Sequence, residues 1–197
     1  MKTVHLIVTM LLVAASTPSF AQQARVHGQI EKLDHSVMTV KTNEDGELAI
    51  RLDRNATVTA MTAAKLADVT RGRFVGTAAH PGGPDGDLVA LEVHIFADSM
   101  RGTGEGHRPM AQGNTMTNAT VDSVVTGVQG RVLTLRYKGG EQKVWVPAKA
   151  PIVMLTPSNR SALKPGEHVS FNATRQTDGV ITAAHVTVGL DGLVPPL

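Results

Sequence analysis

The densest cluster of polar side chains lies in a glycine-rich segment near the middle of the 197-residue chain. It reads Arg101-Gly-Thr-Gly-Glu105-Gly-His107-Arg108-Pro109. A phosphate-binding loop would need GxGxxG spacing and a helix directly after it, and neither pattern is present. Two interpretations remain. The favoured one is a docking segment whose Arg101 and Arg108 pair with acidic side chains, and the alternative is a metal site.

The metal interpretation has a harder and a softer set of ligands. Glu92 and His94 alternate along the preceding strand, so they predict a polar face that Glu105 and His107 could join. The softer set suits Cu(I), and it combines His107 with three methionines that otherwise fill gaps in packing: Met100, Met110 and Met116. Copper or zinc is therefore the alternative cofactor, and the favoured interpretation needs none.

Trp145 lies between Val144 and Val146, so its side chain is expected to point away from the core. Barrels of the OB type often hold ligands on this strand, and the alternative is packing against the linker or the other barrel. Nucleophilic catalysis has no support, because the chain contains no cysteine and no GxSxG motif. The sequence therefore favours a non-catalytic binding or assembly module over an enzyme.

The two halves of the chain carry the same pattern. The turn Asp85-Gly86 and the apolar strand behind it recur about 93 positions later at Asp178-Gly179. The turn glycines Gly72 and Gly166 also correspond, and the apolar positions agree over about 70 residues. Agreement of apolar positions, turns and spacing together predicts an internal duplication.

Each half predicts three strands, a short helix and two further strands, which is the element order of an OB-type barrel. In the first half the helix is expected at residues 62–69. We therefore expect a mainly β protein with two tandem OB-like barrels, each closed by its own five strands around its own core. The predicted boundaries are a signal peptide at 1–21, a first barrel at 24–97, a Gly/His/Arg linker at 98–117, a second barrel at 118–189 and a flexible tail at 190–197.

Three motifs of the first half resemble those of a group of bacterial exported proteins with tandem OB-like β-barrels and no known function. These motifs are V-x-G-x-I at 26–30, L-x-x-G-x-x-V with valine first at 69–75, and D-G-x-L-x-A at 85–90. Some members of the group carry the label "metal ABC transporter permease". A permease needs several spanning helices, and this sequence predicts none after its signal. The resemblance implies a β-barrel fold and export, and it implies no particular activity.

The N-terminal pattern predicts a signal for export. An apolar run follows Lys2, Pro18 ends it, and Ser19 and Ala21 are the small residues that precede a cleavage site. The predicted location is therefore the bacterial periplasm or the exterior. The chain carries 19 basic and 17 acidic residues, so without Lys2 its net charge is about +1. This charge is too small for nucleic acid, and the expected partner is an unidentified protein or small ligand near the linker.

Overall fold

The computed structural model describes residues 23–42, 46–127 and 130–196. The signal peptide predicted at residues 1–21 lies outside the described residues. Within them the regular structure consists of strands and short 3-10 turns, without an α-helix. This confirms the mainly β class.

All twelve strands of the described residues belong to one sheet. In chain order they are β1 (Gln23–Asp34), β2 (Val37–Thr42), β3 (Glu47–Ala63), β4 (Phe74–Pro81), β5 (Leu88–Phe96), β6 (Gly106–Pro109), β7 (Thr115–Gly127), β8 (Gly130–Tyr137), β9 (Gly140–Pro147), β10 (Ile152–Ser158), β11 (His168–Arg175) and β12 (Ile181–Gly189). The 3-10 turns between them are η1 (Leu66–Asp68), η2 (Pro84–Gly86), η3 (Asp98–Met100), η4 (Ala111–Gly113) and η5 (Arg160–Ala162).

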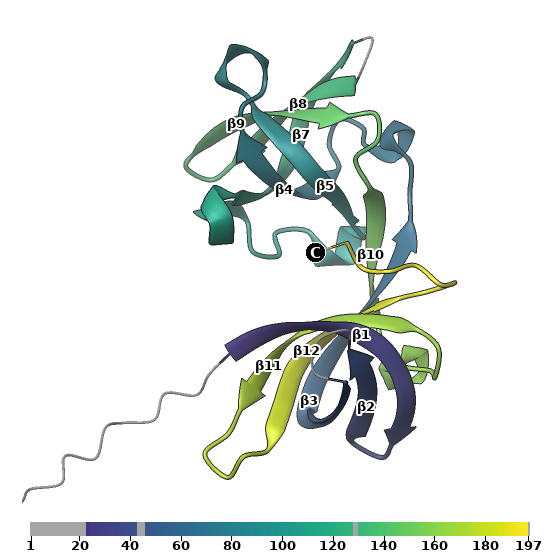
Figure 1. Cartoon of the computed structure of the whole chain (residues 1–197). Coiled ribbons are helices and arrows are strands. Elements are labelled where there is room, and N and C mark those ends of the chain that lie inside the picture. Colours follow the sequence, from purple (N-terminus) through teal and green to yellow (C-terminus); the bar gives the residue numbers. More distant parts are fainter. Residues whose placement is uncertain (1–22, 43–45, 128–129, 197) are drawn as a thin grey trace, which may run out of the picture.

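Five strands from the two ends of the chain form a closed, mixed β-barrel, which we call the terminal lobe (Figure 1, below). Strand β2 lies between β1 and β3, and β11 lies between β1 and β12, all in antiparallel pairs. Strand β12 then runs parallel to β3 and closes the barrel.

The strands in the middle of the chain form the central lobe (Figure 1, above). Strand β4 lies between β5 and β7, and β8 lies between β7 and β9. Strand β9 returns to β5 over only two residue pairs, Leu88 with Val144 and Val89 with Trp145. The central lobe is therefore built from one continuous stretch of chain, whereas the terminal lobe is built from two.

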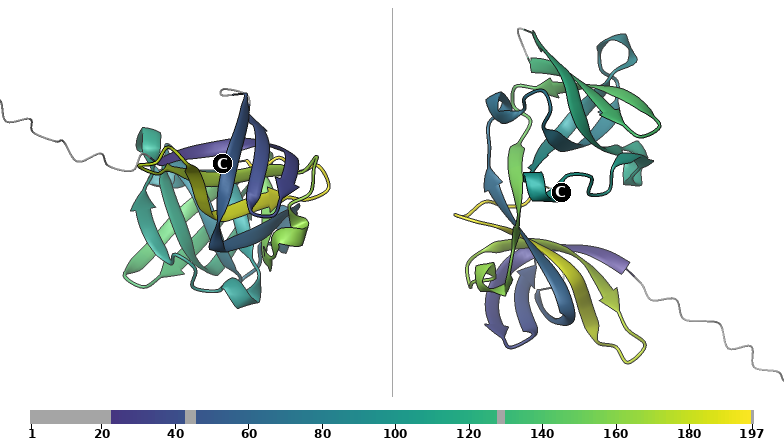
Figure 2. Two further views of the ribbon diagram at one scale, coloured as in Figure 1. Left: turned by 90° about the horizontal axis from the view of Figure 1, so that it is seen from below. Right: turned by 180° about the vertical axis from the view of Figure 1, so that it is seen from behind.

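Two strands, β3 and β10, run side by side from one lobe to the other (Figures 1 and 2). The seventeen-residue β3 pairs with β2 and β12 in the terminal lobe, and its final residues pair antiparallel with β10. Strand β10 in turn runs parallel to β5 of the central lobe. This crossing ladder joins the lobes into a single sheet.

The expectation that each half of the sequence closes its own barrel is wrong. Strands β1, β2 and β3 of the first copy close with β11 and β12 of the second, while β4 and β5 lie with β7, β8 and β9. The predicted boundaries at 24–97 and 118–189 therefore do not separate two barrels. The last two strands of each half lie instead with strands from the other half.

The length of β3 takes the chain out of the lobe in which it began. In the second copy Pro147 and Pro151 interrupt the chain, since β9 ends at Pro147 and β10 begins at Ile152. The first copy has no proline at this place, so β3 runs on to Ala63 and carries the chain out of the barrel in which it began. The helix expected at 62–69 is therefore wrong, and only the three-residue turn η1 forms there.

Each lobe buries an aliphatic core that draws on both halves of the sequence. In the terminal lobe Ile30 and Met38 pack with Phe171 and Val186. A third cluster lies apart from the two lobe cores and takes residues from β3, β4, β5 and β10, namely Met61, Phe74, Phe96, Val153 and Leu155. The lobes are therefore held together by buried side chains as well as by the crossing ladder.

Candidate functional site

The linker predicted at 98–117 is folded against the central lobe. Strand β6 pairs antiparallel with β7, with Gly106 opposite Asn118. The amide Nδ2 of Asn118 donates to the carbonyl oxygen of Thr103 at 3.0 Å. The hydroxyl of Thr103 donates to the carbonyl oxygen of Met100 at 2.6 Å. These bonds satisfy the carbonyl oxygens of Met100 and Thr103 and hold the glycine-rich turn against β7.

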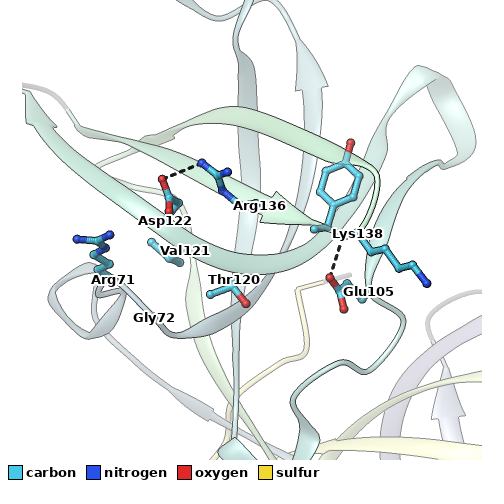
Figure 3. Close-up of a pocket in the computed structure, with 9 residues that line it drawn as sticks. Arg71, Gly72, Glu105, Thr120, Val121, Asp122, Arg136 and Lys138 are labelled. Carbon is cyan, nitrogen blue, oxygen red and sulfur yellow. Dashed lines mark hydrogen bonds and ion pairs between the residues drawn. The ribbon is translucent and has the colours of Figure 1, made fainter.

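A depression of about 490 Å³, which we call the linker pocket, opens where the linker meets β7 and β8 (Figure 3). Its walls come from the turn before β4, from the linker, from β7 and from the end of β8. The lining residues are Arg71, Gly72, Glu105, Thr120, Val121, Asp122, Arg136, Tyr137 and Lys138.

The acidic side chains of the linker pocket already have partners. Asp122 lies 3.3 Å from Nη2 of Arg136, which also lies 3.2 Å from a carboxylate oxygen of Glu141. Glu105 accepts a hydrogen bond of 2.9 Å from the backbone N–H of Lys138. By contrast, the guanidinium of Arg71 and the ammonium of Lys138 have no hydrogen-bond or ion-pair partner among the described residues. The pocket therefore presents two free cations.

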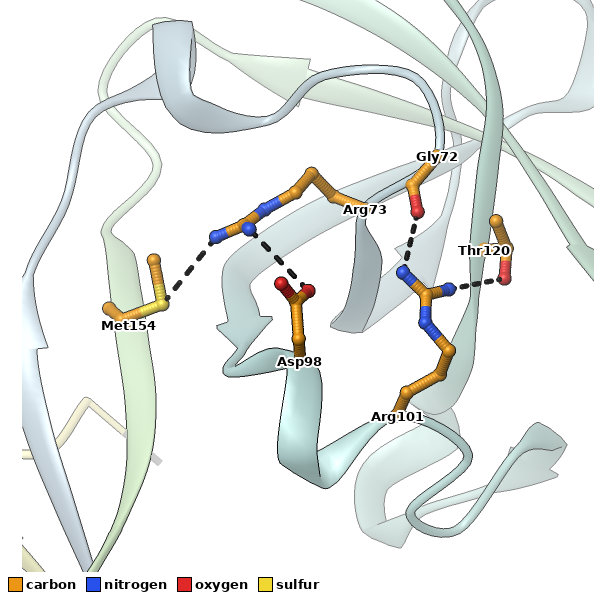
Figure 4. Close-up of polar contacts among 6 residues, drawn as sticks. All are labelled: Gly72, Arg73, Asp98, Arg101, Thr120 and Met154. Carbon is orange, nitrogen blue, oxygen red and sulfur yellow. Dashed lines mark hydrogen bonds and ion pairs between the residues drawn. The ribbon is translucent and has the colours of Figure 1, made fainter.

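Arg101 supports the floor of this pocket (Figure 4). Its Nη2 donates to the carbonyl oxygen of Gly72 at 2.8 Å, and its Nη1 donates to the hydroxyl of Thr120 at 3.4 Å. Beside it, Asp98 lies 3.7 Å from Arg73. Arg101 was expected to meet a carboxylate, and it meets a turn carbonyl instead because that turn leaves the oxygen without another partner.

Arg108 and His107 also serve the fold of the linker. Arg108 donates to the carbonyl oxygen of Gly104 at 2.9 Å, so its expected pairing with an acid is also wrong. His107 Nδ1 is hydrogen-bonded to Thr117 Oγ1 at 2.8 Å, and its ring stacks on Tyr137 with 6.4 Å between centroids. Because Tyr137 lines the linker pocket, His107 lies behind the wall of the pocket.

Trp145 lies outside the linker pocket. It is half-buried on β9, opposite Val132 of β8 and Val89 of β5, and a side chain at Gly130 would meet its indole nitrogen. Of the residues predicted for the site, Glu105 lines the pocket, and Arg101 supports it through its bonds to Gly72 and Thr120. Sequence reasoning missed Arg71, whose one signal is that the second copy has a proline in its place.

Glu92 was expected to face solvent, and this is wrong because the residue is fully buried. Its Oε1 lies 2.6 Å from Nε2 of His94, which is 13% exposed. The Glu92 carboxylate also raises the pKa of Arg25 on β1, opposing the larger lowering by burial. The Glu92–His94 pair is therefore covered by other parts of the protein. The charge of Glu92 also acts on Arg25 in the terminal lobe.

Neither predicted metal set is assembled. Glu92 and His94 meet, but Glu105 and His107 bind Lys138 and Thr117 instead. Of the softer ligands, Met100 packs against the third cluster, Met110 is 38% exposed and Met116 lies opposite Ala78 and Arg108 on β7. Among the described residues, no three His, Asp or Glu side chains are grouped to hold a metal ion.

Two histidines near Arg25 predict a pH dependence of stability. Desolvation lowers the pKa of both His27 and His185, and the Arg25 guanidinium lowers both further, while Glu92 acts in the opposite direction on His27. Because the folded pKa is depressed, the unfolded chain binds more protons below the ordinary histidine value of about 6.5. The free energy of unfolding should therefore fall as the pH drops from about 7.5 to about 5.5.

Urea denaturation across this range measures the slope. The variant His27→Gln/His185→Gln should show a flatter dependence on pH than the wild type, because neither side chain then titrates. An unchanged slope in the variant would contradict this prediction.

Comparisons of the chain with known protein families, with curated proteins and with solved structures found no match in any of the three. Within the described ranges, no helix is both long enough and apolar enough to cross a membrane. The geometry of the site is thus the basis for a functional proposal. The site is a polar depression in which Arg71 and Lys138 have no partner in the part of the chain that the structure describes, and a hydrogen-bonded linker positions it.

Proposed function

We propose that the protein is an exported, non-catalytic binding module whose ligand site is the linker pocket and whose ligand is anionic. The observation that carries this proposal is the pair of free cations, Arg71 and Lys138, in a pocket whose carboxylates are already engaged. A cation that lacks a partner within the protein can meet an anionic ligand without first breaking an ion pair. Export is inferred from the N-terminal sequence pattern alone.

The strand order supports a binding role by analogy. We infer that both lobes are OB-type barrels with exchanged strands, because β1-β2-β3-β12-β11 and β7-β8-β9-β5-β4 follow the same order. Barrels of this type commonly hold ligands at the loops around one face. The analogy concerns the fold, and the chemistry of the pocket is argued separately from its side chains.

The lining residues favour holding a ligand over reacting with it. The part of the chain that the structure describes contributes no serine, cysteine or histidine to the pocket lining. The side chains that line it are three cations, two carboxylates that already have partners, a threonine hydroxyl, a valine and a tyrosine ring. These suit orientation and charge neutralisation of a bound anion.

Charge reversal tests this proposal. The variant Arg71→Glu/Lys138→Glu should bind small anions at least about tenfold more weakly than the wild type, since about 1.4 kcal/mol corresponds to a factor of ten. The probes are citrate and tripolyphosphate, titrated by calorimetry at low salt. Binding by the wild type should also weaken as salt is raised.

The matched control is Lys41→Glu/Arg54→Glu, which makes the same change in net charge on β2 and β3 of the terminal lobe. This control should bind the probes as the wild type does. Equal loss in both variants would show a general charge effect, and no loss in the pocket variant would overturn the proposal.

A further inference from the structure

Strand β7 has an open edge beyond the linker pocket. Its first residues lie opposite β4 from Thr115 to Thr120, and the backbone of Val121 bonds to Gly72 and Arg73. From residue 122 to residue 127 the strand pairs only with β8. The opposite edge of this segment has no partner strand among the described residues. Its backbone N–H and C=O groups are thus free to pair with another chain.

A second depression, of about 610 Å³, follows this open edge. It shares Arg71 and Asp122 with the linker pocket, so the two depressions adjoin, and together we call them the edge groove. Its additional lining residues are Val69, Thr70, Ser123, Val124, Thr126 and Arg131. The groove therefore runs along β7 from Thr120 to Thr126.

The charges of the edge groove favour an acidic occupant. Four basic side chains line it against two acidic ones. Asp122 is neutralised by Arg136, and Arg131 reaches across to donate to the carbonyl oxygen of Leu66 at 2.7 Å. On the same stretch of β7, Val125 is 62% exposed and offers an apolar contact. An occupant must therefore combine negative charge with an extended backbone.

We propose that the ligand of the linker pocket is an acidic segment of another polypeptide, which binds as an added strand along residues 122–127. This inference rests on the proposed function, because it names the class of anion that the same site takes. Backbone hydrogen bonds to the open edge supply affinity, and carboxylates placed near Arg71, which lines both depressions, supply specificity. Six strand residues span about 20 Å, which is the length of a typical strand.

The probe is a fluorescent eight-residue peptide of alternating valine and glutamate, and binding is followed by anisotropy. The same peptide with lysine in place of glutamate should bind at least about tenfold more weakly, as should the parent peptide to Arg71→Glu. The control variant Arg54→Glu should bind the parent peptide as the wild type does. Backbone amides between residues 122 and 127 should become protected from hydrogen exchange on binding.

Two methylated peptides separate strand addition from simple charge attraction. One carries N-methyl groups on every glutamate and the other on every valine, and alternate N–H groups of a strand point to opposite edges. One of the two should therefore lose affinity at least about tenfold relative to the other. Equal binding of both would overturn strand addition and leave an anion-binding pocket.

Titration with the small anions distinguishes failure of the added strand from failure of the anion-binding site. Binding of citrate or tripolyphosphate without binding of the peptide overturns this inference and leaves the proposed function standing. If neither the small anions nor the acidic peptide binds, both are overturned.

Discussion

The two halves of the chain, prepared separately as residues 23–104 and 105–197, should each fail to fold. The terminal lobe takes β1, β2 and β3 from the first half and β11 and β12 from the second. Seven of the fourteen buried residues of its core come from each half. Burial of one large apolar side chain contributes about 1.5–3 kcal/mol, so losing seven core partners costs about as much as the 5–15 kcal/mol that stabilise a typical domain.

Circular dichroism and the dispersion of amide signals in NMR spectra measure the outcome. Each half alone should lack dispersed signals, and mixing the two should restore the folded spectrum as a one-to-one complex. The matched control is residues 64–158, a continuous piece that contains every residue of the central core, including the partly buried ones from Ala64 to Met154. This piece should fold by itself. A dispersed spectrum from either half alone would contradict the exchanged strands.

Replacement of His94 by leucine should lower the free energy of unfolding by about 3–5 kcal/mol. Glu92 is fully buried, and the imidazole of His94 is its contact at 2.6 Å. Without His94 the carboxylate loses this partner in a place that water does not reach. Removing one member of a buried polar pair costs more than the pair contributes, because the remaining group is left desolvated and without a partner.

Urea denaturation of single and double variants isolates this effect. Glu92→Leu/His94→Leu removes both members of the pair, so it should be clearly more stable than His94→Leu alone. As a control, Lys32→Leu breaks the exposed pair with Asp34, 3.5 Å apart, and should cost less than about 1 kcal/mol. A loss below about 1 kcal/mol for His94→Leu would show that water reaches the pair after all.

The positions of some strands could be predicted from the sequence, and their partners could not. The apolar strand expected behind Asp85-Gly86 is β5 in the structure, because the alternation that predicts a strand is a local property. Pairing is not local: Thr57 and His185 are hydrogen-bonded across 128 positions. The two halves share one pattern of apolar positions and turns, so this pattern does not identify which later strands join the first three.

The candidate site was found in part. Arg101 and Glu105 were predicted because a cluster of polar residues among glycines is visible in the sequence. Arg71 and Lys138 were not predicted, because exposed charged residues follow no period in the sequence. Only the fold brings them to the same pocket as Glu105. Glu92 was misplaced for a related reason. Alternation identifies the face of a strand turned away from its own core, but it does not show whether another layer covers that face.

The nested arrangement of the two lobes has a consequence for biosynthesis. Roughly 110 residues separate Val58, where the first strands of the terminal lobe leave it, from His168, where the chain returns to complete it. At about 5–20 residues per second, a ribosome needs on the order of ten seconds to make that interval. During this time the oldest part of the newborn polypeptide carries unsatisfied strand edges, so it is the part that should need a chaperone most.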